Sequence, residues 1–263
     1  MMRAERITAT SRLSAGEVRK LVIPLILFTL LCWGWIIVTA RDMYGSMAGA
    51  SGWMMTLRWD AAHVFLLWAM WAAMMAAMML PSASPMLLLH NGAAKRQGMN
   101  ARASAGRQVY ALAAGYMAVW ALFSIAATAM QCILSMLLMV SPMMTVTSPV
   151  AAAAMLVIAG AYQLTPLKHA CLRACQSPLG FMMGHWRPGI AGAFRMGMDH
   201  GVYCLGCCWA LMLLLFVGGV MNLAVIATLS VVVAFEKISP FGPVGARIGG
   251  VVLMVAAVWM LVR

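Results

Sequence analysis

The sequence predicts an all-α, polytopic helical membrane protein with about seven transmembrane helices, and three observations support this fold class. The chain of 263 residues is 64% hydrophobic and only 9% charged, with a mean hydropathy of +0.92. Several of its apolar runs are long enough to cross a bilayer of about 30 Å. Its Lys and Arg residues gather in alternate loops, which is the pattern that the positive-inside rule describes for multi-pass proteins.

The apolar runs predict a single helical transmembrane domain over residues 21–263, preceded by a basic cytoplasmic tail over residues 1–20. The sixth run is short, so it is either a crossing helix or a re-entrant element. In the second case six crossings remain and the C-terminus changes sides. The predicted spans are 21–40, 61–81, 109–131, 150–167, 199–217, 221–235 and 246–262.

The basic residues predict the orientation of the chain. All of the 18 Lys and Arg residues except Arg41, Arg58 and Arg263 lie in the tail and in the loops after the second, fourth and sixth spans. This bias places the N-terminus in the cytoplasm. The net charge of +12 then orients the chain and meets anionic lipid headgroups, so the lipid bilayer is the expected partner and nucleic acid is not.

The segment 200–212, H-G-V-Y-C-L-G-C-C-W-A-L-M, concentrates potential metal ligands in an apolar stretch. On a helix of ~100° per residue its ligands fall on one side. Thiolate and imidazole are preferred by soft and borderline metals such as Cu(I) and Zn(II). The candidate ligands in this segment are His200, Cys204, Cys207 and Cys208.

Two further cysteines, Cys171 and Cys175, lie one helical turn apart after the fourth span. We expect this segment to fold against the start of the fifth span and to complete a Cys₄ site, or a Cys/His site with His200 or His169, near the cytoplasmic face. Two other interpretations stay open, namely packing of the cysteines as small hydrophobic residues and thiol–disulfide exchange.

Three charged residues are candidates for supporting roles at this site. Asp199 either orients the imidazole of His200 or caps a helix. Glu236 closes a wholly apolar run, where an unpaired carboxylate costs several kcal/mol, so we expect a partner such as Lys168 or a cation of the site.

The second predicted span is rich in methionine, a soft thioether ligand that suits Cu(I) and hardly suits zinc. Methionine also fills ordinary apolar cores, so the stripe is either packing or a metal path. His63, beside Asp60, is either an interfacial residue or part of metal entry. The stripe comprises Met70, Met74, Met75, Met78 and Met79, and further methionines toward the outside are Met43, Met47, Met54, Met55, Met136, Met139, Met143 and Met144.

Four segments have a distinctive pattern: A-G-A-Y-Q-L-T-P-L-K-H-A-C-L-R-A-C-Q-S-P (159–178), G-A-F-R-M-G-M-D-H-G-V-Y-C-L-G-C-C-W-A-L-M (192–212), M-N-L (221–223) and E-K (236–237). With the block W-A-A-M-M-A-A-M-M-L-P of the second span, they resemble the bacterial family labelled predicted metal-binding integral membrane proteins. The resemblance covers about residues 60–240 and implies a metal-binding protein of undefined activity in the inner (cytoplasmic) membrane of a bacterium. The sequence departs from the family pattern at Gln176, where Arg is expected.

These observations predict a membrane protein that binds a soft transition metal for transport or delivery, with copper favoured and zinc possible. A metallochaperone or a cuproprotein is the expected partner, and an oligomer is compatible with the sequence. No nucleotide-binding motif is visible, which argues against an ATP-driven pump. Two alternatives remain, a membrane thiol–disulfide oxidoreductase that uses Cys204 and Cys207, and a non-catalytic subunit of a membrane complex.

Overall fold

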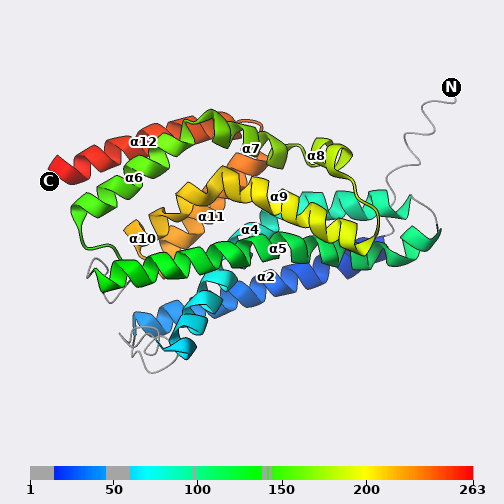
Figure 1. Ribbon diagram of the computed structural model, residues 1–263, viewed down its shortest axis with the longest axis horizontal. Coiled ribbons are helices and arrows are strands. Elements are labelled where there is room, and N and C mark those ends of the chain that lie inside the picture. The colour runs from blue at the N-terminus through cyan, green and yellow to red at the C-terminus, as the bar shows by residue number, and fades with distance from the viewer. Residues whose placement is uncertain (1–14, 46–59, 97–98, 138–140, 142–143, 263) are drawn as a thin grey trace.

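The computed structural model describes residues 15–45, 60–96, 99–137, 141 and 144–262. These residues form a bundle of long helices, with the C-terminus at the end of the bundle opposite to the start of α2 (Figure 1). The helices are α2 (Ala15–Met43), α4 (Ala61–Lys95), α5 (Met99–Met136), α6 (Pro149–Gln163), α7 (Pro166–Gln176), α8 (Pro178–His185), α9 (Gly189–Met212), α10 (Leu214–Gly218), α11 (Leu223–Ile238) and α12 (Gly242–Val262).

The all-α polytopic fold is confirmed. Within the described ranges, α2, α4, α5, α9 together with α10, and α12 are each long and apolar enough to cross a membrane. Helices α6 and α7 pass this test only as a pair that is bent by 64°. Helix α11 has 16 residues, in keeping with the short sixth span predicted from the sequence. All seven predicted segments are therefore helical, and five of them have the full length of a crossing.

Two helices extend well beyond their predicted ends. Helix α4 continues past residue 81 to Lys95, through Pro81 and Pro85, and α9 begins at Gly189 instead of residue 199. Hydropathy marks only the apolar part of a helix, whereas the backbone hydrogen bonds continue through polar residues. As a consequence, Cys204 lies midway along the Gly189–Gly218 span, farther from the end of the span than the sequence predicted.

The bend between α6 and α7 follows from local sequence. The Thr165 side chain caps α7 by accepting a hydrogen bond from the Lys168 backbone N–H, and Pro166 occupies the first turn. Proline is favoured at that position because the first turn needs no N–H donor there, while the residue before proline avoids the helical region. The Thr-Pro pair therefore ends α6 and starts α7 in a new direction, toward α9.

Glycines allow the closest helix contacts in the bundle. Helix α9 runs along α5 in Figure 1, and a Cβ atom added at Gly197 would collide with the carbonyl oxygen of Leu112. Helices α6 and α12 also lie side by side, with Gly160 against the Gly250 carbonyl. Small residues let helix backbones approach in this way in apolar surroundings. The contact between α5 and α9 fixes the position of the helix that carries the cysteines.

The bundle has a buried interior and an apolar outer surface. The largest buried cluster among the described residues includes the inner face of α4 and the cysteines of α9. By contrast, α2 and α12 expose large apolar side chains, the kind of surface that lipid covers. Examples from these two helices are Leu31, Val38, Val255 and Val258.

Candidate metal centre

Three cysteines of α9 form a compact group of sulfur atoms. The Sγ atoms of Cys204, Cys207 and Cys208 all lie within 4.8 Å of one another, and each residue is only 1% exposed. Spacings of three and four residues put these side chains on the same face of one helix. The thiols of Cys207 and Cys208 both donate to the Cys204 carbonyl oxygen, at 3.0 Å, which holds them in this arrangement.

Helix α7 brings a fourth sulfur atom to this group. The Sγ atom of Cys175 lies 3.9 Å from that of Cys207, and Cys175 is buried. Cys171, one turn earlier, packs against the backbone of α9: a Cβ atom at Gly206 would lie 2.8 Å from its Sγ. The structure thus brings both predicted cysteines of α7 onto α9, with Cys175 in the sulfur group and Cys171 half-buried at its edge.

His200 lies outside the three-cysteine group. Its ring packs between the rings of Tyr116 and Phe181, at centroid distances of 5.7 and 5.2 Å. Its Nδ1 atom is buried and has no hydrogen-bond partner within the described part of the chain. His200 therefore lies one turn of α9 before Cys204, with its ring in an aromatic environment.

Asp199 faces Arg187 in this structure. One carboxylate oxygen lies 3.3 Å from Arg187 Nη2, close enough for an ion pair but not aligned as a hydrogen bond. Of the two roles predicted for Asp199, the helix cap is wrong, because α9 begins ten residues earlier, after Pro188. No hydrogen bond joins Asp199 to His200 among the residues described.

Lys237 of α11 points its ammonium group into the sulfur group. Its Nζ atom lies 2.9 Å from Cys204 Sγ, 3.2 Å from Ser82 Oγ and 3.6 Å from Met79 Sδ. Lys237 is buried, and the described residues offer it no ion pair with a carboxylate. A buried cation with this environment needs an anionic partner, and a thiolate at Cys204 supplies one.

Tyr116 of α5 also contacts the same sulfur atom. Its hydroxyl lies 2.9 Å from Cys204 Sγ and 3.2 Å from the carbonyl oxygen of Met79. The sequence places Lys237 among the basic residues after the sixth span and in the E-K segment, but it was not predicted to be a site residue, and neither was Tyr116. An ionisable residue at the end of a long apolar run indicates a functional position, and this signal could have identified Lys237. No local pattern points to Tyr116, because α5 contributes it through tertiary packing.

Lys168 and Glu236 form a buried ion pair beside this centre. The Lys168 Nζ atom lies 2.6 Å from one Glu236 oxygen, and the Gln163 amide donates to the other at 2.9 Å. In the structure, Lys168 is therefore the partner of Glu236, one of the two partners that the sequence predicted. Gln176 donates to the backbone carbonyls of Glu236 and Ser239, so that the end of α7 is fastened to the end of α11. This is the position at which the resemblance led us to expect Arg.

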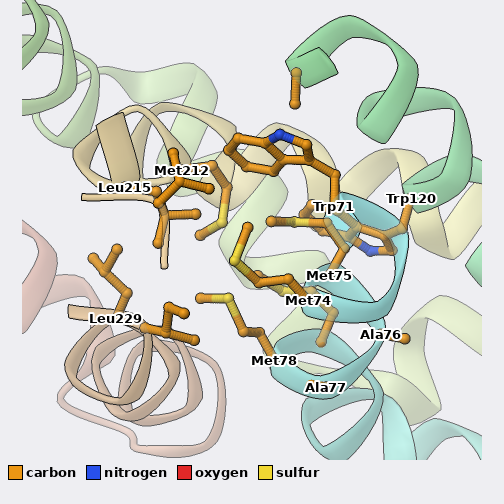
Figure 2. Close-up of a cluster of buried hydrophobic side chains, with 14 of the residues drawn as sticks. Trp71, Met74, Met75, Ala76, Ala77, Met78, Trp120, Met212, Leu215 and Leu229 are labelled. Atoms are coloured by element: carbon orange, nitrogen blue, oxygen red, sulfur yellow. The ribbon is translucent and has the colours of Figure 1, made fainter. Parts of the chain in front are cut away.

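The methionines of the second predicted span point into the bundle. Figure 2 shows side chains of this group together with Met212 of α9, inside a shell that includes Trp71, Leu215 and Leu229. His63 is buried, and its backbone N–H donates to the Asp60 carboxylate at the start of α4. The five methionines, each at most 2% exposed, are Met70, Met74, Met75, Met78 and Met79.

Only part of the outer methionine group lies in the described ranges. Met43 and Met144 are buried in the same cluster as the α4 methionines, whereas Met136 is 66% exposed. The remaining members of the predicted group lie outside the described residues, namely Met47, Met54, Met55, Met139 and Met143.

The arrangement is a sulfur-rich, buried centre with one internal cation. Its potential metal ligands are thiols from two helices and an adjacent thioether, while the imidazole of His200 packs in an aromatic cluster. Such a set fits a soft metal ion better than a hard one. The lysine beside Cys204 also provides positive charge that can offset a metal–thiolate complex of net negative charge.

Comparison with known proteins gives one match. A family model described as a copper chaperone, PpoB2, matches residues 68–260. This range includes all the cysteines and methionines of the centre described above. Searches of curated proteins and of solved structures found no match.

Proposed function

Because the chain belongs to the copper chaperone family PpoB2, we propose that it binds Cu(I) in a membrane and delivers the ion to a copper protein. The ligands proposed are Cys175, Cys204, Cys207 and Cys208. The single observation that carries this proposal is the convergence of three α9 sulfur atoms within 4.8 Å, with Cys175 from α7 only 3.9 Å from Cys207.

The charges around the site favour a monovalent ion over zinc. Zn²⁺ held by four thiolates has a net charge of −2, and one lysine would leave a negative charge in an apolar interior. Cu⁺ held by two thiolates, with the other two of these four cysteines kept as neutral thiols, has a net charge of −1, which the ammonium group of Lys237 can balance. The other nearby charges, Lys168 and Glu236, already neutralise each other.

The membrane location of the proposed function rests on length and composition. Five helices in the described ranges can each cross a bilayer, and the exposed faces of α2 and α12 are apolar. We place the protein in the bacterial inner membrane with its N-terminus in the cytoplasm, since the basic residues follow the positive-inside pattern. The cysteines then lie inside the bundle, and the receiving protein is a metallochaperone or a cuproprotein.

The metal content of the purified full chain tests the proposal. Protein prepared under reducing conditions and loaded with Cu(I) or Zn(II) should retain about one Cu(I) per chain at its cysteines, in line with one cluster of thiol ligands. The double variant Cys204→Ser with Cys207→Ser should lose most of this copper. The matched control, Cys32→Ser with Cys132→Ser, changes two cysteines that lie outside the centre.

Three outcomes would contradict the proposal. Equal copper in the wild type and the Cys204/Cys207 variant would exclude the site. Preferential retention of zinc would exclude the copper assignment. Absence of bound metal, together with a disulfide that cycles between oxidised and reduced forms, would favour the oxidoreductase alternative.

A further inference from the structure

The cysteine centre lies deep in the bundle, so a metal ion needs a route to it. Cys204, Cys207 and Cys208 are each 1% exposed, and they sit midway along the Gly189–Gly218 span. Thiol ligands in an apolar interior cannot be reached through lipid by a bare cation at an acceptable energetic cost. The residues that line the interior next to Cys204 are therefore candidates for a path.

Three thioethers gather in this interior. Met74 and Met78 lie one turn apart on α4, and Met212 lies at the end of α9. Figure 2 shows their sulfur atoms turned toward the same space, with Trp71, Leu215 and Leu229 around them. All three methionines are at most 2% exposed, so the sulfur atoms face one another inside the protein and not the lipid.

One contact joins this methionine group to the cysteine centre. Met79, which directly follows Met78 in the sequence, has its Sδ atom 3.6 Å from Lys237 Nζ, and the same ammonium group lies 2.9 Å from Cys204 Sγ. A positive charge thus already rests between an α4 thioether and the thiol. From Met70 to Met79 the methionine row rises by ~14 Å along the helix axis.

We infer that Met74, Met78 and Met212 form a second, thioether-only site for a soft monovalent cation, from which Met79 leads to Cys204. The destination in this inference rests on the proposed function, whereas the thioether site does not. Methionine sulfur atoms bind Cu(I) and Ag(I) without giving up a proton.

The methionine site and the cysteine site differ in their affinity for a monovalent cation, for an electrostatic reason. Thioethers are neutral, so a bound monovalent cation keeps its full charge in the apolar core. Thiolates neutralise that charge, and the ammonium group of Lys237 balances the resulting complex. The ion is therefore held weakly at the methionines and strongly at the cysteines, which gives the path a direction.

Binding of Ag(I), a soft cation without redox chemistry, tests the thioether site. The full chain with all seven cysteines changed to serine should retain about one Ag(I) in chloride-free buffer, with only thioether sulfur in its X-ray absorption spectrum. Adding Met74→Leu, Met78→Leu and Met212→Leu should abolish this binding. Leucine fills nearly the same volume, so the core should stay packed. The matched control is Met136→Leu with Met183→Leu, because both side chains are largely exposed.

Silver retained by the triple leucine variant, or silver absent from the cysteine-free chain, would overturn the inference. Should the cysteine-free chain fail to fold, the triple leucine variant is made with the cysteines intact. There it should bind about one Ag(I) fewer than the wild type while the cysteines still hold metal. Equal binding would overturn the inference as well. Failure of the proposed function looks different, since it would show in the Cys204→Ser/Cys207→Ser variant.

Discussion

The ammonium group of Lys237 lies 2.9 Å from the sulfur of Cys204, although the two residues are 33 positions apart on different helices. Tyr116 approaches the same sulfur at the same distance. Cys204 is thus set apart from its neighbours by two polar groups from α5 and α11. The ammonium group of Lys237 favours negative charge on this sulfur, so Cys204 is the natural first ligand for an incoming cation.

Replacing Lys237 should weaken copper binding. The variant Lys237→Gln removes the positive charge that balances the metal–thiolate complex, and we expect Cu(I) affinity to fall by about tenfold to a hundredfold, as for other groups that support metal ligands. Competition with a chromophoric Cu(I) chelator measures this change. The control is Lys95→Gln, at the far end of α4. Equal affinity of Lys237→Gln and the wild type would show that the lysine does not balance the bound metal.

The buried pair of Lys168 and Glu236 should matter for stability. Their side chains are 0% and 3% exposed, so Glu236→Leu alone leaves a buried, unpaired lysine and should cost about 3–5 kcal/mol in the free energy of unfolding. The double change Lys168→Leu with Glu236→Leu should recover most of that loss, because no lone charge remains. Denaturant unfolding in detergent micelles measures both. A single variant as stable as the double one would contradict this account.

The contact between α5 and α9 should be intolerant of a single methyl group. Gly197→Ala places a Cβ atom against the Leu112 carbonyl, and the required separation of the helices should cost about 1–3 kcal/mol. Gly184→Ala is the control, because a Cβ atom there meets nothing within 4 Å. Thermal unfolding compares the two variants. Equal midpoints would mean that α9 can shift freely on α5.

Mild oxidation should join α7 to α9. The Cys175 and Cys207 sulfur atoms are 3.9 Å apart, so diamide should oxidise the two thiols to a disulfide, with transfer of two electrons and two protons to the reagent. Peptide mass mapping should find this cross-link, and prior loading with Ag(I) should prevent it. Cys132, a single cysteine of α5, should remain a thiol. A disulfide between Cys204 and Cys207 in its place would favour the oxidoreductase alternative.

Much of the architecture could be predicted because it depends on local chemistry. Apolar runs identified every segment that forms a long helix, since a chain in lipid must satisfy its backbone hydrogen bonds within each crossing. The limits of the helices were less accurate. Helix α9 starts at Gly189, ten residues before the predicted span, because hydropathy does not record the polar turns that continue a helix. This error placed the cysteines too close to one end of the span.

The candidate site, too, could be predicted only in part from the sequence. Spacing alone set Cys204, Cys207 and Cys208 on one helical face, and also suggested that α7 would supply further thiols. Spacing could not show that the His200 ring packs against the rings of Tyr116 and Phe181 and stays outside the three-cysteine group. The direction of a side chain depends on the neighbours that other helices bring to it.

The sequence by itself determined the all-α class, the supply of soft ligands and the periodicity that aligns them along α4 and α9. Only the tertiary structure decided which ligands meet. It carries Cys175 to Cys207, and it brings Lys237 to both Cys204 and Met79. Periodicity acts within one helix over a few residues, whereas these contacts depend on how separate helices pack and on the pairing of charges in an apolar interior.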